Sequence, residues 1–313
     1  MEHSGTNQSS PNGQLSNIAK DRGEAGSLVA DIGQTFVIAY REPTEQLTQT
    51  LSQFGLDSTV LRQVHQPGYE TYSPSFLCLL NHRCAWEKAV ASEQPTLIVE
   101  ADFVPVQNFA TLPPPYNPAD PNLGIAWLYT CAPQVYNVVT TAKGRFAQGY
   151  STSMVAYVVS AKSAQLLIEL AEQVAQDPGP TAYSPWDSGI EYYLRDRGLR
   201  NYVPFRNYGE HGGAPNPEHK QNKLSKAHRA DVLYGKLAFS PMYAQREQAA
   251  PSSTGMSRRH RMNRIDCWKG RAYGRIKGLG RLLLLKYLRG EVVKKSEQGG
   301  ELVKWAITRQ LTL

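Results

Sequence analysis

The feature that most constrains the fold of this chain is the alternation of short apolar runs with segments of helical periodicity. Most runs are followed by a stretch whose apolar residues recur every three or four positions. The expected strands cover Thr35–Tyr40, Ser58–Val64, Pro95–Val99, Gly124–Tyr129, Ser153–Val159 and Tyr202–Phe205. The expected helices cover 43–54, Ser75–Ala91, Ala161–Ala175 and Trp186–Arg197. This alternation predicts an α/β fold with a mostly parallel sheet.

Composition and charge divide the chain into three parts. Residues 1–33 are rich in Ser, Gly, Asn and Gln, with too few apolar side chains to offset the entropy of ordering, so we expect disorder there. Residues 34–244 are long enough to bury one sizeable core. Residues 245–313 form a basic, partly helical tail. The net charge of +7 is uneven, with 18 Lys and Arg against 22 Asp and Glu in 1–245, and 16 against 5 in 246–313.

Several protein classes are disfavoured by what the sequence lacks. The four cysteines form no CxxC pair, which disfavours a zinc module and a disulfide scaffold. The first ten residues are polar and do not resemble a secretory signal, and no apolar run approaches the ~18 residues of a membrane-spanning helix. We therefore expect a cytoplasmic protein.

Two carboxylates follow the expected strand Pro95–Val99, with one residue between them. In open α/β sheets, ligands bind beyond the carboxyl ends of the strands. Glu100 and Asp102 are two residues apart in an extended segment, so their side chains face the same way. They can converge on one hard cation, which prefers oxygen ligands and bridges to phosphates. The alternative is a strand end that turns into solvent, where acidic residues are common.

Four segments, in this order and spacing, resemble glycosyltransferase family 25, which includes lipopolysaccharide-type β-galactosyltransferases. Phe76–Trp86 is similar to a family helix of the form Gly-Cys-x-x-Ser-His-x-x-x-Trp, with Asn81 in place of the serine. Leu97–Asp102 is similar to a strand that ends in Glu-Asp-Asp. Ser151–Ile168 and Pro185–Asp187 resemble two later family segments. The resemblance covers roughly residues 34–210.

The resemblance implies a GT-A-like, single nucleotide-sugar-binding domain that uses Mn²⁺ or Mg²⁺. It implies inverting transfer of a galactose-like hexose from a UDP-sugar to a glycan or lipid-linked acceptor, as in lipopolysaccharide or polysaccharide biosynthesis. Glu100 and Asp102 match the outer acids of the family motif and would bind the metal and the donor. Ala101 replaces the middle acid. This departure motivates an alternative, a non-catalytic relative that binds nucleotide sugars or glycans.

An inverting transfer needs a carboxylate that deprotonates the acceptor hydroxyl on the face of the sugar opposite the leaving diphosphate. Asp187 is the first candidate for this catalytic base, because it belongs to the Pro185–Asp187 match and begins a helix. Glu191, one helical turn later, is the second candidate. The alternative for Asp187 is a helix cap.

A glycine-rich segment, Tyr208–Asn216, is the next candidate for ligand binding. Gly209 would let the backbone approach a ligand closely. Glu210 and His211 are candidates to bind the diphosphate or to complete a metal site. GT-A enzymes often supply a late histidine ligand, so the resemblance points to His211 as the third metal ligand beside Glu100 and Asp102. The alternative is an ordinary turn.

Two further features have more than one interpretation. His82, with Trp86 one helical turn on, is either a core histidine or a support for the acidic strand end. In the tail, Ile276, Leu279 and Leu283 share one side of a basic helix, which is typical of an element that binds an anionic membrane surface. The protein would then lie at the inner face of a membrane. The alternatives are a disordered solubilising tail and a helix docked on the body. Nucleic-acid binding is disfavoured, because no recognised motif accompanies the charge.

Overall fold

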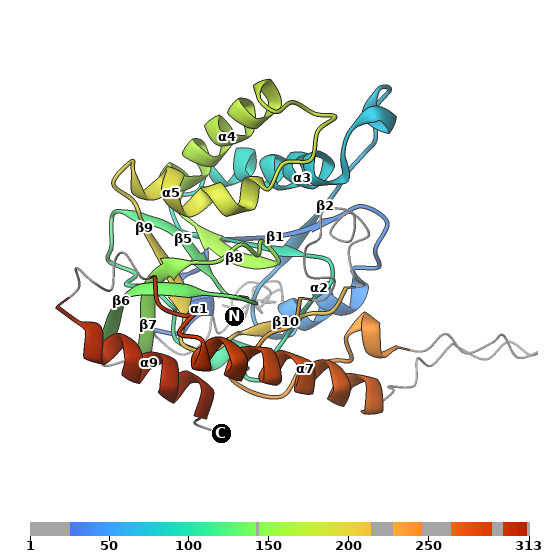
Figure 1. The fold of residues 1–313 in the computed structure, drawn as a ribbon. Helices are drawn as coiled ribbons and strands as arrows, with labels where there is room; N and C mark the ends of the chain where they lie inside the picture. The colour runs from blue at the N-terminus through green and yellow to red at the C-terminus, as the bar shows by residue number, and fades with distance from the viewer. Residues whose placement is uncertain (1–25, 142–143, 214–227, 246–263, 290–296, 312–313) are drawn as a thin grey trace, which may run out of the picture.

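The computed structural model describes residues 26–141, 144–213, 228–245, 264–289 and 297–311. An eight-stranded sheet forms its centre, in the order β2-β1-β3-β8-β5-β9-β7-β6 (Figure 1). The strands are β1 Gln34–Ala39, β2 Ser58–Arg62, β3 Thr96–Glu100, β5 Leu123–Trp127, β6 Gln134–Thr141, β7 Gly144–Tyr150, β8 Ala156–Val159 and β9 Arg200–Pro204. β7 and β8 run opposite to the other six strands. The expected α/β class with a mostly parallel sheet is therefore confirmed.

A second sheet has two strands, and its position matters for the site. β4 (Phe103–Pro105) begins directly after the acidic end of β3, and β10 (Gly209–His211) pairs with it in antiparallel register. His211 lies opposite Phe103 in this pairing. The register thus brings a residue more than a hundred positions downstream to the end of β3.

Helices cover the sheet, and α3, α4 and α5 lie together over one face of it (Figure 1). The helices are α1 Leu28–Asp31, α2 Glu45–Gln53, α3 Pro74–Ala89, α4 Ala161–Gln176, α5 Ile190–Arg195, α7 Arg264–Leu283 and α9 Gly299–Leu311. Short 3₁₀ turns cover Tyr69–Thr71, Phe109–Thr111, Trp186–Gly189 and Met242–Ala244. Ser27 caps α1, and α3 and α4 also begin at serine caps. The Ser73 and Ser160 hydroxyls accept hydrogen bonds from the amides of Phe76 and Ser163.

The core has two parts, one on each face of the sheet, because strand side chains alternate. In β1, Phe36 and Ile38 belong to the part under α3 and α4, whereas Val37 belongs to the other. Ile98 and Val99 of β3 divide in the same way. A strand buried on both faces reads as a continuous apolar run, which is the pattern that predicted these strands.

The structure differs from the sequence expectation at the N-terminal end of the body, and at the C-terminal end it agrees with one of the stated alternatives, a helix docked on the body. Leu28 and Val29 of α1 are buried in the core, so the end of the segment expected to be disordered is folded, while residues 1–25 lie outside the described residues. The expected tail packs on the body, because α9 lies against β6 and its Trp305 side chain is fully buried. No helix in the described residues is long and apolar enough to cross a bilayer.

A buried ion pair anchors the C-terminal helix to the body. The Arg309 guanidinium is fully buried and lies 2.8 Å from the Asp231 carboxylate. It also donates hydrogen bonds to the carbonyls of Pro204 and Phe205 at the end of β9. Burial alone would raise the pKa of Asp231, but the Arg309 charge and hydrogen bonds lower it below its ordinary value. The two ions therefore hold each other charged inside the protein.

Candidate functional site

Three expected metal ligands converge at the end of β3. The ligand atoms of Glu100, Asp102 and His211 all lie within 4.8 Å of one another. The Nε2 atom of His211 lies 2.9 Å from a carboxylate oxygen of Asp102. The local backbone explains the convergence, since β10 pairs with β4 and the Gly212 amide donates a hydrogen bond of 2.8 Å to the Asp102 carbonyl. The hydrogen-bonded backbone positions both side chains.

The arrangement fits a small divalent cation. Asp102 Oδ1 and His211 Nδ1 are both buried, and neither has a hydrogen-bond partner among the described residues. A Cβ at Gly213 would lie 2.1 Å from Asp102 Oδ2 and 3.0 Å from His211 Nε2, so only glycine leaves this space open. Two carboxylates and one imidazole form a mixed oxygen and nitrogen donor set that suits Mn²⁺ or Mg²⁺.

The charge balance of the site also suits a cation. Burial alone would lower the pKa of His211, but the Asp102 carboxylate, its hydrogen bond and the Glu100 charge raise that pKa to about 9. Without a metal the imidazole is therefore protonated at neutral pH and neutralises part of the acidic charge. A metal ion would take the place of that proton.

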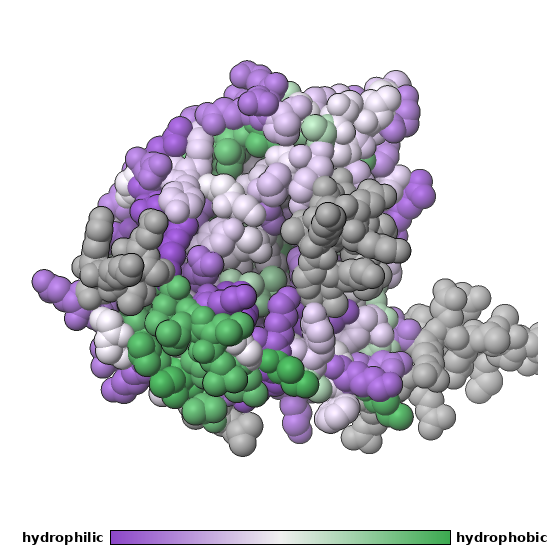
Figure 2. All heavy atoms as spheres, viewed as in Figure 1, coloured by the Kyte–Doolittle hydropathy of each residue, from purple (hydrophilic) through white to green (hydrophobic). Residues whose placement is uncertain are grey.

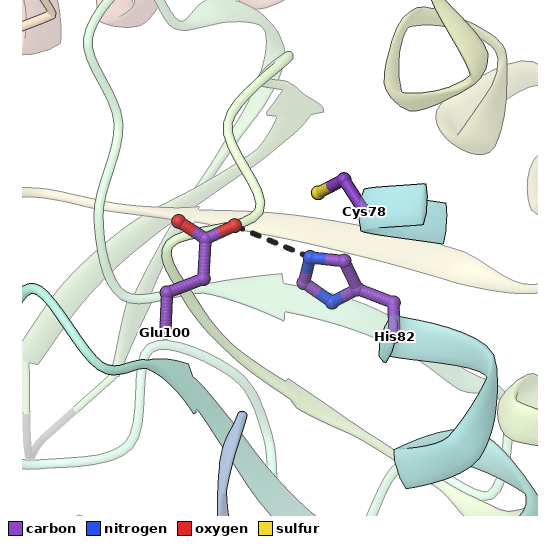
Figure 3. Close-up of side chains that lie close together, drawn as sticks. All are labelled: Cys78, His82 and Glu100. Carbon is purple, nitrogen blue, oxygen red and sulfur yellow. Dashed lines mark hydrogen bonds and ion pairs between the residues drawn. The ribbon is translucent and has the colours of Figure 1, made fainter. Parts of the chain in front are cut away.

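His82 supports Glu100 from the core. The His82 side chain is fully buried on α3, and its Nε2 atom lies 3.2 Å from the Glu100 carboxylate (Figure 3). Its Nδ1 atom lies 2.8 Å from the Tyr157 hydroxyl, which accepts a hydrogen bond from the Trp86 indole. With a proton on Nε2, His82 donates a hydrogen bond to Glu100, and its Nδ1 atom is held by the Tyr157 hydroxyl. The second interpretation of His82, as a support for the acidic strand end, is favoured.

Two cavities meet at the acidic strand end. The first, of about 430 Å³, lies beyond the carboxyl ends of β1 and β2, and Tyr40, Gln63 and His65 line it. The rings of Tyr40 and His65 are stacked with their centroids 4.3 Å apart. The second, of about 300 Å³, is lined by segments around β8, by the 3₁₀ turn at Trp186 and by His211. Glu100 and Asp102 line both cavities, as does Cys78.

Asp187 faces the second cavity, in which Glu100, Asp102 and His211 also take part. Burial raises the pKa of Asp187 to about 6, against the opposing effect of hydrogen bonds from Ser188. The Ser188 hydroxyl lies 3.4 Å from its carboxylate. A carboxylate with a pKa near the working pH is suited to accept a proton, so the position and the pKa are those that a general base needs.

Two other predicted site residues, Glu191 and Glu210, do not line the cavities. The Glu191 carboxylate is fully buried and binds Arg195 at 2.9 Å and Arg289 at 2.7 Å, so it is neutralised as part of the core. Glu210 is also fully buried, and it binds Arg271 and the amides of Ala230 and His211. Neither expectation, a second base at Glu191 or a ligand role for Glu210, is supported by these positions.

Gly209 is required for packing rather than for approach to a ligand. A Cβ there would lie 2.4 Å from the Phe103 ring and 2.5 Å from the Val104 carbonyl. The glycine that borders the cation site is Gly213, four residues later. A close approach of the backbone to a ligand in this segment stays a prediction, and Gly213 is the glycine next to the candidate ligands.

The first cavity is lined in part by residues that no sequence motif indicated. Tyr40 follows β1, and Gln63 and His65 follow β2, so all three lie at the carboxyl ends of parallel strands. Their position at or just after the ends of the first two expected strands is a signal in the sequence, because α/β sheets bind ligands beyond the carboxyl ends of their strands.

Comparisons with known proteins give a limited likeness. No protein-family model and no curated protein matches this chain. Two similar solved structures are both glycosyltransferases. One is involved in the glycosylation of the major capsid of PBCV-1, with 12% identity and a TM-score of 0.35 over 54% of this chain and 80% of that chain. The other is a mutant Drosophila β-1,4-galactosyltransferase 7 in complex with manganese, UDP-Gal and xylobiose, with 14% identity and a TM-score of 0.34 over 62% of this chain and 75% of that chain.

Proposed function

We propose that this chain is a metal-assisted glycosyltransferase of GT-A-like fold, which transfers a galactose-like hexose from a UDP-sugar to a glycan or lipid-linked acceptor. One observation supports this most, the convergence of Glu100, Asp102 and His211 on the wall between two cavities, with Asp187 in the second. A transferase needs a donor pocket, an acceptor pocket, an anion-stabilising site between them and a base. The two neighbouring solved structures are of the same reaction class.

The first cavity would bind the nucleotide part of the donor. It lies at the carboxyl ends of parallel strands, where α/β sheets bind nucleotides. The exposed His65 ring, which stacks on Tyr40, offers a flat surface for a base. Glu100, Asp102 and His211 would hold Mn²⁺ or Mg²⁺, which when bound stabilises the negative charge of a leaving diphosphate. Glu100 and Asp102 line both cavities, which suits a diphosphate that extends from the first cavity toward the second cavity.

The second cavity would bind the transferred sugar and the acceptor. Asp187 accepts the proton of the acceptor hydroxyl as the acceptor oxygen attacks the anomeric carbon. The new glycosidic bond forms while the bond from that carbon to UDP breaks, and attack from the opposite face inverts the anomeric centre. His82 holds the Glu100 carboxylate in place through these steps.

The expected cellular setting belongs to the same proposal. A lipid-linked acceptor would place the enzyme in lipopolysaccharide or polysaccharide biosynthesis, in the cytoplasm and at the inner face of a membrane. The support is the excess of cations in the C-terminal segment, with 16 Lys and Arg against 5 Asp and Glu.

The test is UDP-sugar turnover by the full chain with and without Mn²⁺, in wild type and in Asp102→Asn. We expect wild type to hydrolyse the donor slowly and only with the metal. Asp102→Asn should lose at least about 100-fold of this hydrolysis rate and, in the presence of Mn²⁺, should bind UDP more weakly than wild type does. Glu87→Gln is the matched control, because this carboxylate on α3 is half exposed and pairs with Arg83 at the surface.

Two results would count against the proposal. Metal-independent UDP-sugar binding without turnover, unchanged in Asp102→Asn, would favour the alternative of a non-catalytic relative, which Ala101 in place of an acid motivates. No binding of any UDP-sugar would exclude both.

A further inference from the structure

The helix α7 has an apolar face that points away from the protein. Ile265, Trp268, Ile276, Leu279 and Leu283 fall within an arc of about 80° on a helical projection. All five side chains are exposed, from 37% for Leu279 to 83% for Leu283. Amphipathic helices of globular proteins ordinarily turn such a face toward the core. The helix α7 therefore turns its apolar face toward solvent and its opposite face toward the protein.

Three glycines explain this orientation. Gly270, Gly274 and Gly278 lie on the opposite face of α7, one turn apart, and pack against the body. A Cβ at Gly274 would lie 2.2 Å from the Ala230 carbonyl, and one at Gly270 would lie 2.6 Å from the Tyr243 ring. Arg271 holds the same side through its ion pair with Glu210. Close packing of the glycine face leaves the apolar face outside.

The exposed face continues into an apolar patch, which we define as Ile276, Leu279, Leu283, Leu284, Leu285, Val303 and Ile307. Figure 2 shows a broad hydrophobic area over α9 and the end of α7. A groove of about 340 Å³ lies within it, lined mainly by leucines of α7 and the following turn and by α9. Leu285 has a positive φ of 53°, a conformation that is uncommon for leucine, and its side chain is 61% exposed. Exposed apolar areas of this kind mark interaction sites.

The charge around the patch indicates the kind of partner. Residues 264–289 and 297–311 contain ten Lys and Arg against three Asp and Glu. Arg271, Arg289 and Arg309 pair with carboxylates of the body. Lys269 and Lys286 are exposed, each next to an exposed apolar residue of α7 or of the turn after it.

A second copy of the chain fits this surface poorly. In a two-fold dimer the same patch occurs on both sides, so the cations of one copy would face those of the other. An anionic lipid surface is complementary to both features, since its headgroups attract the lysines and its acyl region accepts leucine and tryptophan side chains.

We propose that the apolar patch and its flanking lysines dock this protein on the surface of an anionic lipid bilayer. The helix lies on the membrane and does not cross it, in keeping with its many cations and glycines. The inference is independent of the donor chemistry, because binding to lipid requires neither the nucleotide sugar nor the metal.

The test is co-sedimentation of the full chain with vesicles of phosphatidylcholine, with or without about 30 mol% phosphatidylglycerol. We expect wild type to bind the anionic vesicles. The triple variant Leu283→Ser, Leu284→Ser and Leu285→Ser should lose at least about tenfold in partitioning, because three exposed side chains no longer insert. Lys269→Gln and Lys286→Gln should each lose about fivefold on anionic vesicles. Val64→Ser is the control, since Val64 is 74% exposed and lies outside the patch.

Sedimentation velocity of the same proteins without lipid tests whether a second copy of the chain, and not a lipid surface, covers the patch. We expect a wild-type monomer and a triple variant of unchanged stability in urea, because the substituted side chains are exposed. The proposal would be overturned in favour of a second copy if wild type is a dimer, the triple variant is a monomer, and wild type does not bind vesicles. Equal vesicle binding by wild type and the triple variant would overturn it as well. Donor hydrolysis measured without lipid tests the proposed enzyme separately.

Discussion

Asp187→Asn should impair the transferase and at the same time stabilise the fold, with a gain that depends on pH. Burial raises the pKa of Asp187 to about 6 from an ordinary value of 3.8. Protonation of the Asp187 carboxyl therefore favours the folded state. The stabilisation from this bound proton is fully present below about pH 4 and is lost as the pH rises through 6. At pH 8 the ionised carboxylate costs about 3 kcal/mol of unfolding free energy relative to a neutral isostere, at about 1.4 kcal/mol per pKa unit.

The assay is urea unfolding of wild type and Asp187→Asn at pH 8 and pH 5. The variant should be more stable by about 3 kcal/mol at pH 8 and by about half of that at pH 5, where the folded wild type is mostly protonated. Donor turnover at pH 8 should fall by about 10²–10⁴-fold, as expected for a lost general base, and wild-type turnover should decline below about pH 6. Asp196→Asn, an exposed aspartate at the end of α5, should change stability by less than about 0.5 kcal/mol.

The same gain in stability at both pH values would refute the reasoning, because it would show that the charge of Asp187 is not the cause. A less stable variant at pH 8 would show that the carboxylate makes stabilising contacts that outweigh its burial. Unchanged turnover with the expected stability would remove Asp187 from the mechanism and leave its electrostatics intact.

Three further predictions concern other parts of the structure. His82→Phe should weaken Mn²⁺ binding by about 10–100-fold in calorimetry, because the Glu100 carboxylate loses its positioning hydrogen bond; unchanged affinity would make His82 a packing residue only. Arg309→Met should lower the free energy of unfolding by about 3–5 kcal/mol in urea, since it leaves a buried carboxylate unpaired. Gly274→Ala should destabilise through its contact with a backbone carbonyl, whereas Gly280→Ala, which meets no atom within 4 Å, should stabilise α7 by about 1 kcal/mol in the same assay. Equal effects of the two alanines would contradict the proposed packing of α7.

Much of the body could be predicted from the sequence because its signals are local. The apolar runs of β1 and β3 are buried on both faces, so neither needs a partner to be recognised as a strand. Ser73 and Ser160 mark helix starts by hydrogen bonds that span three residues. The hairpin of β6 and β7 was not predicted, because these strands are partly exposed and their apolar pattern is weak.

The candidate site also contains residues that local sequence patterns predict and residues whose position depends on the tertiary structure. Glu100 and Asp102 could be named from the sequence, because two acids directly after a buried strand must lie at its carboxyl end. The position of His211 beside them depends on the pairing of β10 with β4, which no local pattern encodes. The glycine-rich segment suggested a ligand role for Glu210, but pairing and burial turned that side chain inward toward Arg271.

The sequence by itself determined the fold class, the acidic end of β3 and the excess of positive charge in the C-terminal segment. Only the tertiary structure decided how that segment is oriented, because an amphipathic pattern does not say which face of a helix turns inward. The close packing of Gly270, Gly274 and Gly278 on the body decided it, and left Leu279 and Leu283 of α7 exposed. Short-range patterns encode which elements form, whereas contacts between residues distant in sequence decide which side chains meet and which remain exposed.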